Sequence, residues 1–239
     1  MKNLTLINIC LSFFALSVAQ TPAPDQNKRI LLYGGIAHIG NGEVIENSLI
    51  ILEGGKILTI EDASNIRIDI SGAEYHDVIG KHVYPGFILP NTTLGLADID
   101  AVRATKDFDE VGEFNPHIRS IIAYNTDSPV VPTVRTNGVL VGQITPRGGR
   151  ISGTSSIVQL DAWNWEDALI VKNVGIHLNW PSPYTSKRFS SGERTIEKNK
   201  NYIKKIKEIK DFFISSKSYL PNPDPINLEY EGMRNLFNG

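Results

Sequence analysis

The feature that most constrains the fold of this chain is a pair of glycines, Gly54 and Gly55, between two β-forming runs. Residues 48–53 read SLIILE and residues 56–60 read KILTI, and both runs are rich in residues that favour strands. Two such runs on either side of a short glycine turn predict a β-hairpin. Further short strands are expected over Ile30–Leu32, Arg67–Ile70 and Tyr75–Ile79. We therefore expect residues 29–83 to form a small antiparallel β-sandwich.

The pattern changes after Val83, where short apolar runs alternate with helical stretches. Buried strands are predicted over Gly138–Ile144 and Ser155–Leu160. Helices are expected over Ile99–Thr105, over Trp165–Lys172 behind Asn164 as N-cap, over Ser191–Ser216 and over Asn227–Phe237. The Ser191–Ser216 helix would bury a stripe made of Ile196, Ile203, Ile206, Ile209 and Phe213. Buried strands alternating with helices are typical of a parallel α/β architecture.

The first residues of the chain have the pattern of a secretory signal peptide. Lys2 supplies a positive start, Leu4–Leu16 is an apolar run too short to cross a bilayer, and Ser17–Ala19 offers small residues for cleavage. We expect residues 1–19 to be a signal peptide and residues 20–28 to be a mobile Pro-rich leader. The protein is therefore predicted to be exported, either to the periplasm or into the medium.

Removal of the signal peptide removes Cys10, the one cysteine of the sequence. The mature chain then has no disulfide, no cysteine nucleophile and no thiolate ligand for zinc. Lys2 is also lost, so 23 basic residues face 26 acidic ones, and no nucleic-acid partner is expected. No later run is apolar enough to span a membrane, so no membrane partner is expected after cleavage.

Four segments resemble the amidohydrolase superfamily, in particular its imidazolonepropionase-like exported members. They read GGIAHIGNG over 34–42, SLIILEGGKILTI over 48–60, GKHVYPGFI over 80–88 and NGVLVGQITPRGGRISG over 137–153. The resemblance implies a (β/α)8 TIM-type barrel with metal at its C-terminal face, preceded by a composite β-sandwich. It also implies hydrolysis of carbon–nitrogen bonds, in which a metal-bound hydroxide attacks a carbonyl and an acidic residue shuttles the proton.

The sequence departs from the family at its first metal-binding motif. The family's first barrel strand reads Pro-Gly-Phe-Ile-Asp-x-His-x-His, whereas this chain has Leu89, Asn91 and Thr93 at the aspartate and histidine positions. Strand side chains alternate, so positions 91 and 93 would both face the barrel interior. A neutral amide and a hydroxyl are weak zinc ligands. We therefore assign no metal to residues of this chain, and expect a divalent metal such as zinc only in a full-length protein with further strands.

Two other places are candidates for lining a pocket. The glycine-rich loop over 146–153 holds Arg147, Gly148 and Gly149, and it either cradles an anion with its backbone N–H groups and two arginines or forms a tight turn. His177 is either a wall of the pocket mouth or a loop histidine packed under an aromatic ring. The acidic stretch between Asp98 and Glu113 is expected to be solvated. No residue of the chain is assigned a catalytic role.

Two functions follow from the resemblance and the missing histidines. The first is an amidohydrolase-like hydrolase of which residues 84–239 form the N-terminal part of an incomplete barrel. The second is a non-catalytic homologue that keeps the pocket and works as a binding or partner subunit. A small-molecule substrate is expected for the first function. A second copy of the chain or a second amidohydrolase-like subunit is the partner expected for the second.

About half a barrel cannot close, and its open strand edges invite aggregation. We therefore predict that the isolated 239-residue chain expresses poorly. Measurement of soluble yield and of thermal unfolding checks this, and a sharp cooperative transition from a monomer would contradict it.

Overall fold

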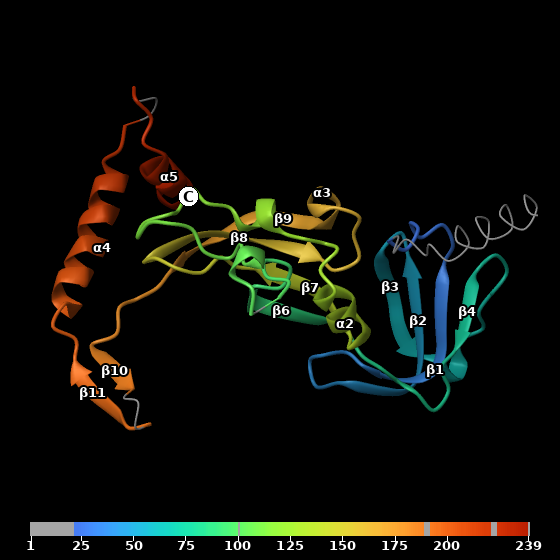
Figure 1. Cartoon of the computed structure of the whole chain (residues 1–239). Coiled ribbons are helices and arrows are strands. Elements are labelled where there is room, and N and C mark those ends of the chain that lie inside the picture. Colours follow the sequence, from blue (N-terminus) through green and yellow to red (C-terminus); the bar gives the residue numbers. More distant parts are fainter. Residues whose placement is uncertain (1–21, 100, 189–191, 221–223, 239) are drawn as a thin grey trace, which may run out of the picture. The chain divides into compact units, whose positions relative to one another are not determined.

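The computed structural model describes residues 22–99, 101–188, 192–220 and 224–238, and the expected signal peptide lies outside these residues. The chain forms two compact units, Met1–Gly86 and Phe87–Gly239 (Figure 1). The sequence placed the boundary between Val83 and Tyr84. Both units mix strands with irregular segments, and the second unit adds helices, so the class is mixed α/β.

The first unit is a five-stranded sheet. Its strands are β1 (Ile30–His38), β2 (Val44–Glu53), β3 (Lys56–Asp62), β4 (Glu74–Asp77) and β5 (His82–Val83). The order is β3-β2-β1-β4, and β5 also pairs with β1. The predicted hairpin is confirmed: β2 and β3 are antiparallel around Gly54 and Gly55, whose φ angles of 57° and 72° favour glycine.

The sheet is mixed, which corrects the expectation of a purely antiparallel module. β1 pairs parallel to both β4 and β5. The predicted strand over Arg67–Ile70 is not formed, because this segment is part of the long return from β3 to β4. Ile68 of this segment and the preceding Ile66 pack on the buried side chains of Leu31 and Leu49. The apolar alternation in this segment therefore reflects contact with a sheet face and not strand pairing.

The described end of the Pro-rich leader is held to the hairpin, although the sequence suggested that it is mobile. The side chain of Gln26 donates to the carbonyl of Leu52 (2.9 Å) and accepts from the backbone N–H of Gly55 (2.8 Å). These bonds satisfy backbone groups at the turn of the β2–β3 hairpin.

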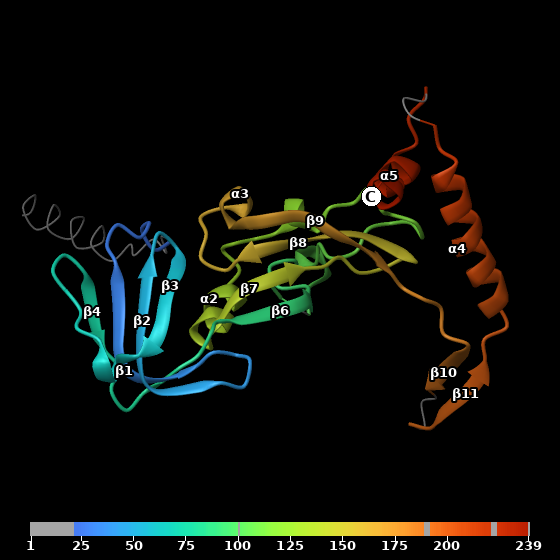
Figure 2. The same ribbon diagram turned by 180° about the vertical axis from the view of Figure 1, so that it is seen from behind.

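The second unit is built on a four-stranded sheet in the order β6-β7-β8-β9 (Figure 2). The strands are β6 (Phe87–Thr92), β7 (Val139–Ile144), β8 (Ile151–Gln159) and β9 (Leu169–Leu178). β6 and β7 are parallel, with helix α2 (Val130–Thr136) in the connection between them. β7, β8 and β9 are antiparallel neighbours. The expected parallel architecture is thus limited to one strand pair, because residues 145–150 are too few for a parallel crossover between β7 and β8.

The helices differ from the expected ones mainly in length. Asn164 is the N-cap of α3 (Trp165–Ala168), and its side chain accepts from the N–H of Asp167 (2.8 Å). The helix makes a single turn before β9 begins, so the predicted extent to Lys172 is wrong. Between Ile99 and Thr105 a 3₁₀ turn over Arg103–Thr105 replaces the expected helix.

The C-terminal helices are α4 (Tyr202–Lys217) and α5 (Leu228–Asn238), and the second matches its prediction. The start of α4 was placed too early. Residues Arg194–Lys198 form strand β11, which pairs with β10 (Tyr184–Arg188). Ile196 therefore lies on a strand and is 74% exposed.

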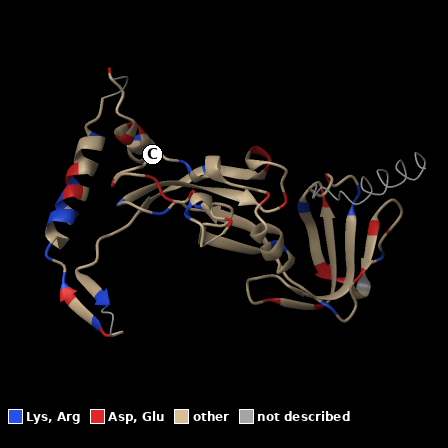
Figure 3. Cartoon of the chain, viewed as in Figure 1, with Lys and Arg blue, Asp and Glu red and all other residues tan. Residues whose placement is uncertain are grey.

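The buried side of α4 is also rotated from the predicted stripe. Ile209 and Phe212 are buried whereas Ile203 is exposed. Phe212 joins Ile151 of β8 and Met233 of α5 in a small core. The lysines and acidic residues of α4 alternate along its surface (Figure 3), as expected of a solvated face. No helix in the described part of the chain combines the length and apolarity needed to cross a bilayer.

The main core of the second unit covers one face of the β6–β9 sheet. It contains Ile144 and Val158 from the strands, Leu160 directly after β8, and Ile121, Tyr124 and Val131 from the segments that pack on them. This packing fixes β7 and β8, and thereby the loop that joins them.

Replacement of Ile144 by alanine should reduce the free energy of unfolding by about 2–5 kcal/mol, because Ile144 is fully buried in this core. Chemical denaturation measures the change. The control is Leu140→Ala on the same strand, where the side chain is 50% exposed and a loss below about 1 kcal/mol is expected. Equal losses for the two variants would contradict the proposed core.

Candidate functional site

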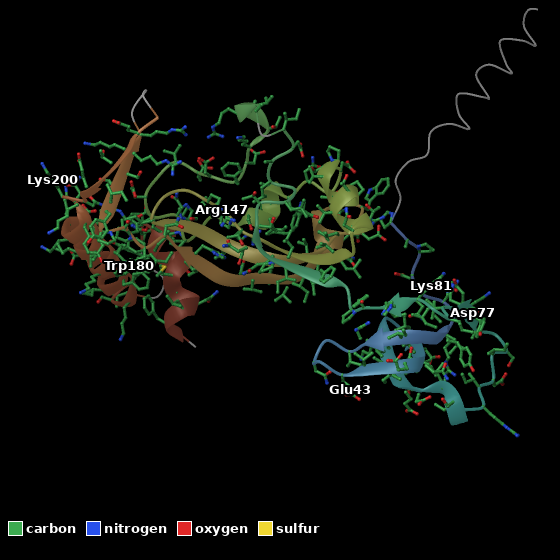
Figure 4. All side chains as sticks on the ribbon, turned by 90° about the horizontal axis from the view of Figure 1, so that it is seen from below. Glu43, Asp77, Lys81, Arg147, Trp180 and Lys200 are labelled. Carbon is green, nitrogen blue, oxygen red and sulfur yellow. The ribbon has the colours of Figure 1, made fainter. Side chains whose placement is uncertain are left out.

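Asn91, near the end of β6, is held by Arg147 from the loop after β7. Arg147 Nη1 donates to Asn91 Oδ1 (2.5 Å), and Nη2 donates to the main-chain oxygen of Asn91 (2.6 Å). Asn91 has a φ of 50°, a conformation that asparagine tolerates better than most residues. Its N–H donates to Oε1 of Gln143 on β7 (3.2 Å). Figure 4 shows Arg147 beside the strands of this sheet.

Thr93 does not join this contact. β6 ends at Thr92, and the carbonyl of Thr93 accepts from the N–H of Leu96 (2.9 Å) in a turn. The left-handed φ of Asn91 interrupts the extended backbone on which strict alternation depends. Positions 91 and 93 would share one face only in a regular strand. The strand is not regular at Asn91, so Thr93 does not follow the expected alternation.

The loop between β7 and β8 is a tight turn that requires its glycines. Gly148 and Gly149 have φ angles of 82° and 56°. A Cβ atom on Gly149 would lie 2.9 Å from the carbonyl oxygen of Gly112. The side-chain amide of Asn179 donates to the carbonyls of both Gly148 (3.0 Å) and Gly149 (3.1 Å). These contacts favour the tight turn over the anion cradle as the reason for the glycines.

The two arginines of the loop are in different electrostatic states. Arg150 forms ion pairs with Glu113 (3.3 Å) and with Glu208 of α4. Arg147 has no carboxylate partner among the described residues, and its side chain donates to the neutral oxygens of Asn91. A cradle with two available arginines is therefore not formed, and one uncompensated guanidinium remains.

His177 lies on β9, not in a loop, and pairs with Gly153 of β8. Its Nε2 atom is buried and has no hydrogen-bond partner within the described residues. Burial lowers the pKa of His177, and the positive charge of Arg147 lowers it further. The imidazole is therefore neutral near pH 7.

Two polar residues that the sequence reasoning missed connect these strands. Nε2 of Gln143 donates to Oγ of Ser155 on β8 (3.1 Å), and Ser155 is fully buried. Gln143 also accepts from Asn91, so one side chain links β6 to β8. The sequence contained a signal for Gln143, because a polar residue within the apolar run of a buried strand needs a hydrogen-bond partner. We call Asn91, Gln143, Arg147, Ser155 and His177 the Arg147 cluster.

The Arg147 cluster does not fit a zinc ion. The Asn91 oxygen that would face a metal accepts from a guanidinium, and the charge of Arg147 repels a cation. Zinc sites in proteins usually have at least three N, S or O side-chain ligands. No group of three histidine, cysteine or acidic side chains suited to hold a metal is found within the described ranges.

A separate hollow of about 400 Å³ is lined in part by Pro146 of the same loop. Its lining includes Asp107, Asp109, Glu110, His117 and Arg119. Part of the acidic stretch thus faces a hollow, and its residues Asp107, Asp109 and Glu110 are exposed, as expected of a solvated segment. Asp109 pairs with Arg103 (3.4 Å), and the buried Nδ1 of His117 has no partner in the described chain.

Comparison with known proteins places the fold but not the activity. No family model matches the chain, and no curated protein matches its sequence. Among solved structures, an amidohydrolase from Thermotoga maritima MSB8 matches with a TM-score of 0.68 and 17% identity, over 86% of this chain and 54% of that one. The chain therefore shares the fold of that structure over the matched part, and it spans about half of that protein's length.

A prolidase complexed with N-methylphosphonate-L-proline matches with a TM-score of 0.33 and 21% identity, over 48% of this chain and 25% of that one. This second likeness is too low to bear on the overall fold. The resemblance seen in the sequence is thus supported as a likeness of fold to one amidohydrolase structure. Membership of the superfamily and of its imidazolonepropionase-like subgroup stays a prediction.

Replacement of Arg147 by glutamine should raise the pKa of His177, because the charge that opposes the imidazolium is removed. The pKa of His177 in this variant should stay below the ordinary 6.5, because burial is the larger cause of its lowering. NMR titration of the His177 ring measures the change. Arg188, which is exposed and has no ion pair among the described residues, provides a control, and Arg188→Gln should leave the His177 titration unchanged.

The same shift has a consequence for stability. Because the folded pKa of His177 lies below the unfolded one, the unfolded chain binds the proton more readily between the two values. The contribution of His177 thus reduces stability as the pH falls through that window, and Arg147→Gln should weaken this acid sensitivity. An unchanged His177 pKa in Arg147→Gln would rule out the electrostatic contact.

Proposed function

We propose that this chain is the N-terminal part of an exported amidohydrolase-like hydrolase that acts on carbon–nitrogen bonds of small molecules. The observation that carries the proposal is the likeness of 86% of the chain to the Thermotoga maritima amidohydrolase. The chain spans only 54% of that protein, so the proposal places the catalytic residues outside the described segments.

In this proposal the parallel pair β6–β7, with α2 between them, is the beginning of a TIM-type barrel, and the first unit is its composite domain. Active sites of such barrels lie at the C-terminal ends of the strands. Asn91 and the loop with Arg147 follow the C-terminal ends of β6 and β7. Their place in the sheet supports a role in binding substrate, while the segments 34–42 and 137–153 support the imidazolonepropionase-like subgroup.

Export is a further part of the proposal. It is supported by Lys2, the apolar run Leu4–Leu16 and the small residues Ser17–Ala19. The mature protein would then work in the periplasm or outside the cell.

The chain's own residues would orient a substrate in the proposed hydrolase. Arg147 holds Asn91 in place, and burial together with the charge of Arg147 keeps His177 neutral by lowering its pKa. Since the Arg147 cluster does not fit zinc, no hydrolytic step is assigned to it. Any metal of the complete protein would need ligands from other segments.

A second function is favoured by the contact between Arg147 and Asn91. A guanidinium bound to the residue at the first histidine position suits a homologue that binds small molecules without catalysis. Such a protein would work as a binding subunit, alone, with a second copy, or with another amidohydrolase-like subunit.

Hydrolysis assays on the product of the complete coding sequence separate the two functions. N-acyl amino acids, cyclic amides and dipeptides are suitable substrates, before and after loading with zinc, with bound metal measured in the same samples. The hydrolase predicts at least one metal equivalent and turnover that a chelator removes. Less than one equivalent and no turnover after loading would reject it in favour of the binding subunit. Leu58→Ala, an exposed site in the first unit, serves as the control variant.

A further inference from the structure

Arg147 differs from every other half-buried arginine of the described chain. The half-buried arginines are Arg135, Arg147, Arg150 and Arg234. Arg135 pairs with Asp161, Arg150 with Glu113 and Glu208, and Arg234 with Glu231. Arg147 alone among them has no carboxylate partner in the described residues. A partly desolvated charge is costly without a counter-charge, so this position points to a ligand of opposite charge.

The guanidinium of Arg147 is also fixed in orientation without being neutralised. A guanidinium has five N–H donors, and the two bonds to Asn91 use one from each terminal nitrogen. The remaining donors can receive a carboxylate, for which a bidentate contact is the favoured geometry. Since both acceptors on Asn91 are neutral, its contacts orient the arginine and leave its charge available.

His177 supplies a second polar group without a partner. Its buried Nε2 atom bonds to no described residue, and a neutral imidazole can carry a donor N–H there. His177 pairs with Gly153 at the beginning of β8, the strand that directly follows the loop of Arg147. The side-chain amide of Asn179, shortly after His177, holds Gly148 and Gly149 and so ties the end of β9 to the loop of Arg147.

We propose that the Arg147 cluster is a binding site for a monovalent organic carboxylate and not for a metal ion. A single uncompensated positive charge matches a single negative charge. A phosphate dianion would call for a second cation, but Arg150 is already paired with Glu113 and Glu208. The site lies where the parallel strands β6 and β7 end, which is the edge at which ligands of open α/β sheets bind.

This site gives the proposed hydrolase a substrate class, and in that respect it rests on the proposed function. The substrates would be amides that carry a free carboxylate, such as N-acyl amino acids, with the carboxylate on Arg147. Binding of the carboxylate itself needs neither turnover nor a metal, so it is measured separately.

The test is an NMR titration of the isotope-labelled chain with N-acetylglycine and, as a neutral match, with N-acetylglycinamide at constant ionic strength. N-acetylglycine should shift the His177 ring signals in a saturable way and raise the pKa of His177, because the bound carboxylate offsets the charge of Arg147. The amide should bind at least about tenfold more weakly, since it lacks the charge-assisted bonds.

The variant Arg147→Gln should lose about tenfold or more in affinity for N-acetylglycine. Arg119 is exposed and has no ion pair among the described residues. The variant Arg119→Gln should therefore bind N-acetylglycine like the unchanged chain. If Arg147→Gln fails to fold by circular dichroism, Arg147→Lys replaces it. Lysine keeps the charge but loses the planar fork, so an affinity between those of the unchanged chain and the amide control is expected.

Equal affinity for the acid and the amide, or no saturable shift at His177, would overturn the proposal. So would stoichiometric binding of zinc that is lost in His177→Ala. Carboxylate binding without turnover in the complete protein would reject the hydrolase and keep this site. Turnover of amides without selectivity for a free carboxylate would support the hydrolase and reject this site.

Discussion

The pair of hydrogen bonds from Arg147 to Asn91 is the contact on which the arrangement of the site depends. It joins the end of β6 to the loop after β7 through both the side chain and the main chain of Asn91. It also accompanies the left-handed backbone of Asn91, which ends the regular strand before Thr93. The direction of β6, the turn that follows it and the position of a free positive charge are thus set together.

Local signals in the sequence predicted the local structure well. The turn at Gly54 and Gly55 and the N-cap at Asn164 are each decided by a few neighbouring residues, and both form as expected. Predictions failed where tertiary contacts decide. The segment 66–70 alternates like a strand but packs on a sheet face, and Ile196 continues a helical stripe but pairs in a hairpin. Periodicity does not report which neighbour covers an apolar residue, and the exposed Ile196 shows that it does not always report burial.

The candidate site was predictable in its members and not in its electrostatics. Asn91, Arg147 and His177 were identified from the sequence, and they meet at one part of the sheet. The charge balance of Arg147 and of Arg150 could not be told apart from the sequence. The carboxylates that pair with Arg150 come from the distant positions Glu113 and Glu208. Gln143 and Ser155 were missed because a polar residue in a buried strand has meaning only once its partners are known.

The ion pair between Arg150 and Glu208 links helix α4 to the charge of the loop that carries Arg147. Ile209 and Phe212 anchor that helix, and Phe212 packs against Ile151, which directly follows Arg150. Undocking α4 would withdraw Glu208 and leave the loop with a larger share of positive charge. In the proposed site, the valence of the preferred anion would therefore depend on the docking of α4. Mutations in that hydrophobic contact would then alter ligand selectivity without changing any residue at the ligand.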